Sequence, residues 1–306
     1  MTTAIGSKKN KVKKSSGDWA FSVIVGILIV FVLAITLYPL IYVFSMSISE
    51  PLRAARGDVI LFPKGFDLTS IKKILNDRDV LTFYGNTILY TVVGTAMGII
   101  VTGLAAYPLS RKEFTYRGFF MKFVMLTMYF SGGMIPLYII VTRFLHMYNT
   151  RWPILLLPLA NAWYIIVART FFQSLPDEIV ESARIDGASE WRIFLQLILP
   201  VSKPILAVLA LYYAVGQWNA YFHAMLYLSR KELQPLSLYI RRVVVQNSVT
   251  NMMGVAVAGN ITAEELLSSL QIKYSVIVVA VLPMLLFYPF LSKYLEKGLL
   301  IGSVKA

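Results

Sequence analysis

Six long stretches without a charged side chain constrain the fold of this chain more than any other feature. Asp, Glu, Lys and Arg are absent from residues 19–49, 80–110, 123–142, 152–168, 204–229 and 274–292. Each stretch is close to or above the roughly 20 residues that cross the hydrocarbon core of a bilayer. Because lipid cannot hydrogen-bond the backbone, such a segment satisfies its own groups as a helix. The sequence therefore predicts an all-α membrane protein with six transmembrane helices.

A seventh uncharged stretch, residues 243–263, is not expected to span the membrane. Its amide and hydroxyl side chains are too many to bury in lipid. They are Gln246, Asn247, Ser248, Thr250, Asn251, Asn260 and Thr262. We expect this stretch to belong to an outer segment, residues 229–273.

The net charge of +13 is best explained by membrane topology rather than by nucleic-acid binding. A basic tail, residues 1–18, precedes the first span, and an even number of spans places both termini on one side. The positive-inside rule then predicts cytosolic N- and C-termini. The first apolar run is too long for a signal peptide, so we expect it to be retained in a six-helix domain over residues 19–306. The tail lysines are Lys8, Lys9, Lys11, Lys13 and Lys14.

Two of the predicted helices carry small residues with structural meaning. Gly94, Gly98 and Thr102 recur every four residues in the second helix, which predicts close packing against a neighbouring helix. Ser131, Gly132 and Gly133 interrupt the third helix. That interruption fits either a broken helix lining a cavity or a simple kink.

The segment between the fourth and fifth predicted helices is acidic, against the basic charge expected of a cytosolic loop. We predict two short helices here, the first beginning near Pro176 and ending at Gly187 in a left-handed conformation. Ser189 is expected to cap the second helix, and Glu181 to pair with Arg184. An amphipathic helix in the headgroups is the alternative, but an acidic helix suits an anionic inner leaflet poorly. Docking into a protein partner is therefore favoured.

This segment resembles the EAA loop of ABC-transporter permeases, whose pattern is Glu-Ala-Ala, three residues, Gly, nine residues, Ile, one residue, Leu-Pro. Five positions match at the right spacing, and Ser182 and Leu197 depart from the pattern by small or isosteric changes. The matching residues are Glu181, Ala183, Gly187, Leu199 and Pro200.

The resemblance extends over residues 85–299, which we take as the core of the domain. It is closest to carbohydrate-import permeases of the maltose type, the second membrane subunit of a pair. The run Tyr129–Pro136 is similar to a Gram-positive subgroup linked to complex or acidic oligosaccharides. This implies a multi-pass protein of a bacterial cell membrane that moves an oligosaccharide and has no enzymatic activity of its own.

In such permeases the loop sits in a cleft of a cytosolic ATPase and passes on its movement. The chain has no Gly-x4-Gly-Lys-Ser/Thr motif, so ATP and Mg are expected on partner subunits and no cofactor in this chain. The implied partners are a second homologous permease, two ATPases and an extracellular binding protein. The implied coupling residues are Glu181, Ala183, Arg184, Asp186, Gly187, Ala188, Trp191, Leu197, Leu199 and Pro200. Trp191 fits an anchor in the headgroups equally well.

Gln217, Trp218 and Asn219 lie in the fifth apolar run and are candidates for a substrate path. Aromatic faces stack on sugar rings and amides bond sugar hydroxyls. Hydrogen bonding between helices is the alternative reading. Ser131, Gly132 and Gly133 are the second group of path candidates.

Other functions remain open at this point. The same architecture serves peptides, amino acids or polyols, and a secondary transporter is a further alternative. That class usually carries carboxylates inside its spans, and the six uncharged stretches have none. Neither a catalytic constellation nor a metal site is expected, because His146 and His223 are the only histidines and lie far apart in the sequence.

Overall fold

The computed structural model describes residues 16–252 and 271–289. The tail lysines, residues 253–270 of the predicted outer segment, and residues 290–306 with the end of the sixth predicted span lie outside the described residues. In the described part, the chain is helical, apart from an isolated bridge between Ser49 and Phe66. The α-helices are α1 (Ser16–Ser47), α2 (Pro51–Ala55), α3 (Thr69–Asn76), α4 (Arg78–Ser110), α5 (Arg117–Tyr129), α6 (Met134–Ile139), α7 (Trp152–Leu156), α8 (Ala162–Gln173), α9 (Glu178–Ile185), α10 (Glu190–Ile193), α11 (Leu199–Val201), α12 (Lys203–Trp218), α13 (Phe222–Tyr227) and α14 (Leu236–Met252). Two π-helices, η1 (Ile140–Phe144) and η2 (Phe194–Ile198), a 3-10 helix, η3 (Lys231–Leu233), and the helix Gln271–Pro289 complete the fold.

Three helices are long and apolar enough to cross a membrane: α1 from Gly17, α4, and the helix Gln271–Pro289. Two bent pairs pass the same test together. The segment from α5 to η1 bends by 108°, and the segment from α10 to α12 bends by 81°. The described residues therefore provide three to five candidate spans, and six spans remain a prediction.

The fourth predicted span is not one helix, which corrects the sequence analysis. It divides into α7 and α8, separated by residues 157–161. Pro158 brings no backbone N–H to a helix, and Asn161 starts α8 by accepting the Tyr164 N–H on its side-chain oxygen at 3.2 Å. This uncharged stretch thus contains the end of one helix and the start of another.

The fifth predicted span also ends earlier than expected. Helix α12 stops at Trp218, and α13 follows as a separate short helix. The Ala220 N–H bonds the Gln217 carbonyl only three residues back at 3.2 Å, and the Asn219 side chain occupies the Val215 carbonyl at 2.9 Å. Both contacts tighten and end the helix.

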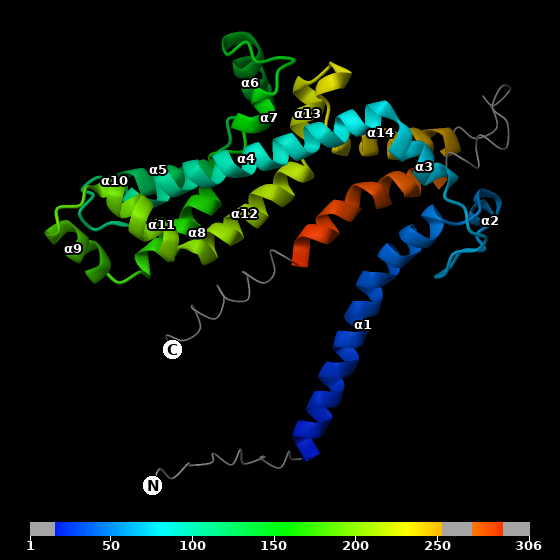
Figure 1. Ribbon diagram of the computed structural model, residues 1–306, viewed down its shortest axis with the longest axis horizontal. Coiled ribbons are helices and arrows are strands. Elements are labelled where there is room, and N and C mark those ends of the chain that lie inside the picture. The colour runs from blue at the N-terminus through cyan, green and yellow to red at the C-terminus, as the bar shows by residue number, and fades with distance from the viewer. Residues whose placement is uncertain (1–15, 253–270, 290–306) are drawn as a thin grey trace, which may run out of the picture.

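Close packing of α4 on α12 forms the centre of the molecule (Figure 1). Gly98 faces the Tyr213 ring, where an added Cβ would lie 2.6 Å from Cε1, and Gly94 faces Gln217 in the same way. Thr102 Oγ1 and the Tyr213 hydroxyl are hydrogen-bonded at 2.7 Å. The small-residue face predicted from the sequence is therefore the face that admits α12.

The EAA-like segment lies at the end of α4 opposite to α2 and α3, with α9 and α10 at the tip of the molecule (Figure 1). A buried apolar cluster underlies it. Tyr107, Phe172, Ile193, Phe194 and Ile198 belong to this cluster, together with Val180 and Ala183 of α9.

Candidate functional site

The turn at Gly187 is built by backbone conformation. Gly187 has φ of +75°, a region that side chains with a Cβ rarely adopt. Its N–H bonds the Arg184 carbonyl, and the Ala188 N–H bonds the Ala183 carbonyl, both at 3.0 Å. This is a Schellman motif, with Ala183 and Ala188 packed together on the core. The predicted stop of α9 at Gly187 is confirmed.

The start of the second short helix differs in one respect. Ser189 occupies the N-cap position of α10, but its side chain makes no capping hydrogen bond. The backbone alone sets the start, since the Ile193 N–H bonds the Ser189 carbonyl at 2.9 Å.

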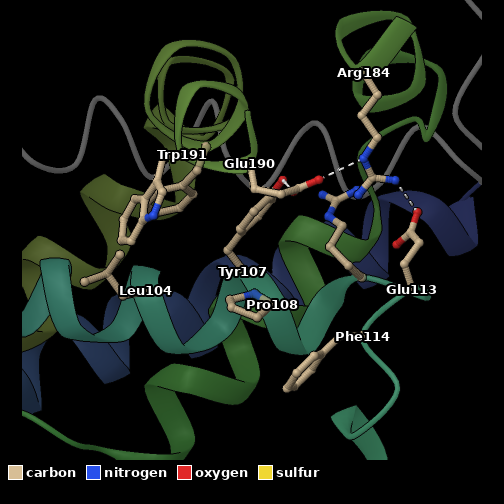
Figure 2. Close-up of a pocket in the computed structure, with 10 residues that line it drawn as sticks. Leu104, Tyr107, Pro108, Glu113, Phe114, Arg184, Glu190 and Trp191 are labelled. Carbon is tan, nitrogen blue, oxygen red and sulfur yellow. Dashed lines mark hydrogen bonds and ion pairs between the residues drawn. The ribbon is translucent and has the colours of Figure 1, made fainter. Parts of the chain in front are cut away.

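Arg184 does not pair with Glu181, as the spacing had suggested. Its Nη1 donates to Glu113 Oε1 and its Nε to Glu190 Oε1, each at 2.8 Å (Figure 2). The Glu113 carboxylate raises the pKa of Arg184 further, and the Arg184 hydrogen bond lowers the pKa of Glu113. Arg184 thereby links three elements: α9, α10 and the turn between α4 and α5.

A second set of contacts holds the start of α9. Lys112 Nζ bonds Asp177 Oδ2 at 2.8 Å, which lowers the pKa of Asp177 and raises that of Lys112. Arg111 is 7% exposed, and its guanidinium lies over the Tyr107 ring and donates to the Phe172 carbonyl at 3.2 Å. The turn after α4 therefore contacts α9 at both ends, through Lys112 at its start and Glu113 near its end.

A pocket of about 470 Å³ opens between α4 and α10 (Figure 2). Trp191, 65% exposed, lies beside Leu104 on its apolar side, and the Tyr107 hydroxyl donates to Glu190 at 3.2 Å on its polar side. Trp191 is thus accessible near the tip of the molecule that α9 and α10 form. The lining residues are Leu104, Tyr107, Pro108, Arg111, Glu113, Phe114, Arg184, Glu190, Trp191 and Phe194.

The end of the EAA-like segment forms the bend into α12. Leu197 lies in the π-helix η2, and Leu199 and Pro200 begin α11. Both leucines pack against the buried cluster. These positions therefore connect the tip of the molecule to the base of α12.

The structure places one group of substrate-path candidates at the C-terminal end of α12 and the other in the break between α5 and α6. Gln217 is 4% exposed, donates to the Ile154 carbonyl at 3.4 Å, and leaves its Oε1 without a hydrogen bond. Trp218 is also buried and donates to the Ala280 carbonyl at 3.2 Å, whereas Asn219 is exposed at the end of α12. The other group lies between α5 and α6, and all of its residues are exposed: Ser131, Gly132 and Gly133.

The sequence analysis did not identify the residues at the end of α4 and in the α4–α5 turn that contact α9 and α10. Tyr107, Arg111, Lys112 and Glu113 were not singled out as site residues. The available signal was the charged run at 111–113, directly after an uncharged helix and opposite in charge to the acidic loop. Among the described residues, no group of three His, Asp or Glu could hold a metal ion.

Comparison with known proteins shows the family of this chain. The family model described as "Binding-protein-dependent transport system inner membrane component" matches residues 12–301. The chain is 40% identical to protein LplC of Bacillus subtilis, covering 89% of this chain and 90% of the relative. It is 36% identical to the polygalacturonan/rhamnogalacturonan transport system permease protein YtcP of the same organism, covering 92% and 96%.

A solved structure is also similar. It is the crystal structure of a bacterial ABC transporter involved in the import of the acidic polysaccharide alginate, with a TM-score of 0.80 and 33% identity over 93% of this chain and 99% of that chain. The resemblance drawn from the EAA-like loop is confirmed. The chain belongs to the family of binding-protein-dependent transport system inner membrane components.

Proposed function

We propose that this chain is the membrane-spanning permease subunit of an ATP-driven importer that moves an oligosaccharide into the cell. It is itself non-catalytic, because ATP and Mg bind to separate ATPase subunits. The observation that carries the proposal is the Gly187 turn at the tip of the bundle, held by ion pairs on its inner side and open on its outer side. Movement applied to such a tip is passed on to α4, α8 and α12.

The substrate we propose is an acidic oligosaccharide. Two relatives are named for acidic or pectic polysaccharides. Charge supports the same class, since the predicted outer turn at 143–152 and the predicted outer segment 229–273 carry seven basic residues against Glu232, Glu264 and Glu265. Basic surfaces concentrate anionic ligands. The seven are Arg143, Arg151, Arg230, Lys231, Arg241, Arg242 and Lys273.

A second permease subunit is supported by α1. This helix leaves the body at its Ser47 end and extends away from it (Figure 1). Its apolar window is 0% buried within the chain. We propose that it lies against the partner permease and lipid, with both termini cytosolic, while two ATPases bind at α9 and an extracellular binding protein delivers the sugar.

Copurification tests this proposal. The tagged chain, extracted in mild detergent, is expected to bring down one homologous permease and two ATPase subunits per copy of the chain. Hydrolysis of ATP by that complex is expected to rise when a binding protein loaded with a uronate oligosaccharide is added. Isolation of the chain as a solitary protein that transports on its own would reject the proposal.

A further inference from the structure

The side chains of α9 separate into two sides. Val180 and Ala183 are buried on the core, and Arg184 is held by Glu113 and Glu190. Ile185, the last residue of the helix, is 86% exposed, more than any other large apolar side chain in the described residues. The core therefore accounts for the inner side of α9 and leaves Ile185 without a neighbour of its own kind.

The surroundings of Ile185 do not suit lipid. It directly precedes Asp186 and Gly187 at the end of α9, the helix at the tip of the molecule (Figure 1). Carboxylates next to it would meet the anionic headgroups of an inner leaflet. An isoleucine in that setting is exposed to water unless a protein covers it.

Three exposed carboxylates surround this position. Glu178, Glu181 and Asp186 form no ion pair with any described residue, in contrast to Asp177 and Glu190, which pair with Lys112 and Arg184. The free surface of α9 is thus an apolar side chain with an acidic surround. Well-packed apolar anchors ringed by polar contacts are typical centres of protein interfaces.

We propose that Ile185 is the anchor of the contact between this chain and its ATPase subunit. It inserts into an apolar socket of the ATPase whose rim carries Lys or Arg side chains that face Glu178, Glu181 and Asp186. The inference rests on the proposed function, which supplies the ATPase. It assigns the anchor to a residue that the EAA pattern does not specify.

Thiol labelling tests the contact directly, because the chain has no cysteine. The Ile185→Cys variant, assembled with its partner permease and ATPases, is treated with a membrane-impermeant maleimide in open membranes. We expect labelling of this chain to slow about tenfold when the ATPase is bound, compared with membranes stripped of ATPase. Ile60→Cys is the matched control, since Ile60 is 68% exposed and lies in the outer segment before α3. Its labelling rate is expected to stay constant.

Affinity provides the second measurement. In stripped membranes that contain both permeases, Ile185→Ser is expected to weaken rebinding of the ATPase by about tenfold or more, and Ile185→Leu to preserve it. Ile60→Ser should behave as wild type. Equal labelling with and without the ATPase, or wild-type rebinding of Ile185→Ser, would overturn the assignment of the anchor. Failure of the wild-type membranes to bind any ATPase would instead reject the proposed function.

Discussion

Arg184 joins parts of the chain that are far apart in sequence. Its two carboxylate partners lie in the α4–α5 turn and in α10. Exposed ion pairs contribute about 0–1 kcal/mol each, so their contribution to overall stability is small. Their main effect is mechanical, because they connect α9 to the turn after α4 as well as to its covalent neighbours.

Loss of this link should reduce coupling more than stability. Arg184→Gln removes both ion pairs, and a weakening of about 1 kcal/mol corresponds to roughly a fivefold looser hold on α9. We expect ATP hydrolysis by the assembled complex to continue while sugar transported per ATP falls severalfold. Arg192→Gln is the control, because within the described residues the Arg192 side chain donates a hydrogen bond only to Gln196. An unchanged transport ratio in Arg184→Gln would show that the link carries no movement.

Gly187 is required for its backbone angle rather than for space. An added Cβ would meet nothing within 4 Å, but φ of +75° disfavours other residues. Gly187→Val should therefore abolish ATP hydrolysis that depends on the sugar-loaded binding protein, whereas Gly187→Asn, which tolerates this angle, should retain most of it. Equal activity of the Val and Asn variants would contradict a conformational role.

The ion pairs of Glu113 and Asp177 that hold α9 should weaken only at acid pH. Partners lower the pKa of Glu113 and of Asp177 in the folded chain. Their stabilising effect is therefore fully present above the ordinary carboxyl pKa near 4 and is lost as the pH falls through the lowered values. Hydrogen exchange of α9, corrected for its intrinsic rate, should stay constant from pH 9 to pH 5 and rise only below about pH 4. A rise at pH 6 would mean that other groups hold α9.

At the scale of elements, the α4–α12 contact depends on the absence of side chains. Gly98→Ala would place a Cβ 2.6 Å from the Tyr213 ring, so the ring or one of the two helices must shift. Overpacking of this kind costs about 1–3 kcal/mol, and we expect Tm in detergent to fall by several degrees. Gly85→Ala in the same helix meets nothing within 4 Å and should be neutral or stabilising. A common response of both variants would indicate helix propensity rather than packing.

Local patterns predicted those features that depend on near neighbours in sequence. The Gly187 stop, the two short helices and the small-residue face of α4 belong to this group. The breaks at 157–161 and 219–221 were missed because a test for uncharged stretches detects transfer into lipid and does not detect backbone stops. The pairing of Arg184 with Glu113 joins residues 71 positions apart, so no helical spacing indicates it. The partner predicted for Arg184, Glu181, follows from i, i+3 spacing, which considers α9 as an isolated helix.

At the scale of the whole molecule, two surfaces of the chain have no counterpart within the described residues. Helix α1 buries none of its apolar window, and the acidic surface of α9 faces outward. Lipid and the proposed partner permease would cover α1, and the proposed ATPase contact would cover Ile185 on α9. On the proposed function, the bundle moves only when ATPase subunits act on its tip.

Reconstitution tests this claim most directly. Proteoliposomes that contain this chain, its partner permease and both ATPases, supplied with a binding protein and a labelled uronate oligosaccharide, should accumulate the sugar only when ATP is present on the ATPase side. Vesicles with the two permeases but no ATPase should show none, even with an imposed proton or sodium gradient. Gradient-driven uptake in the absence of ATPase subunits would contradict the account.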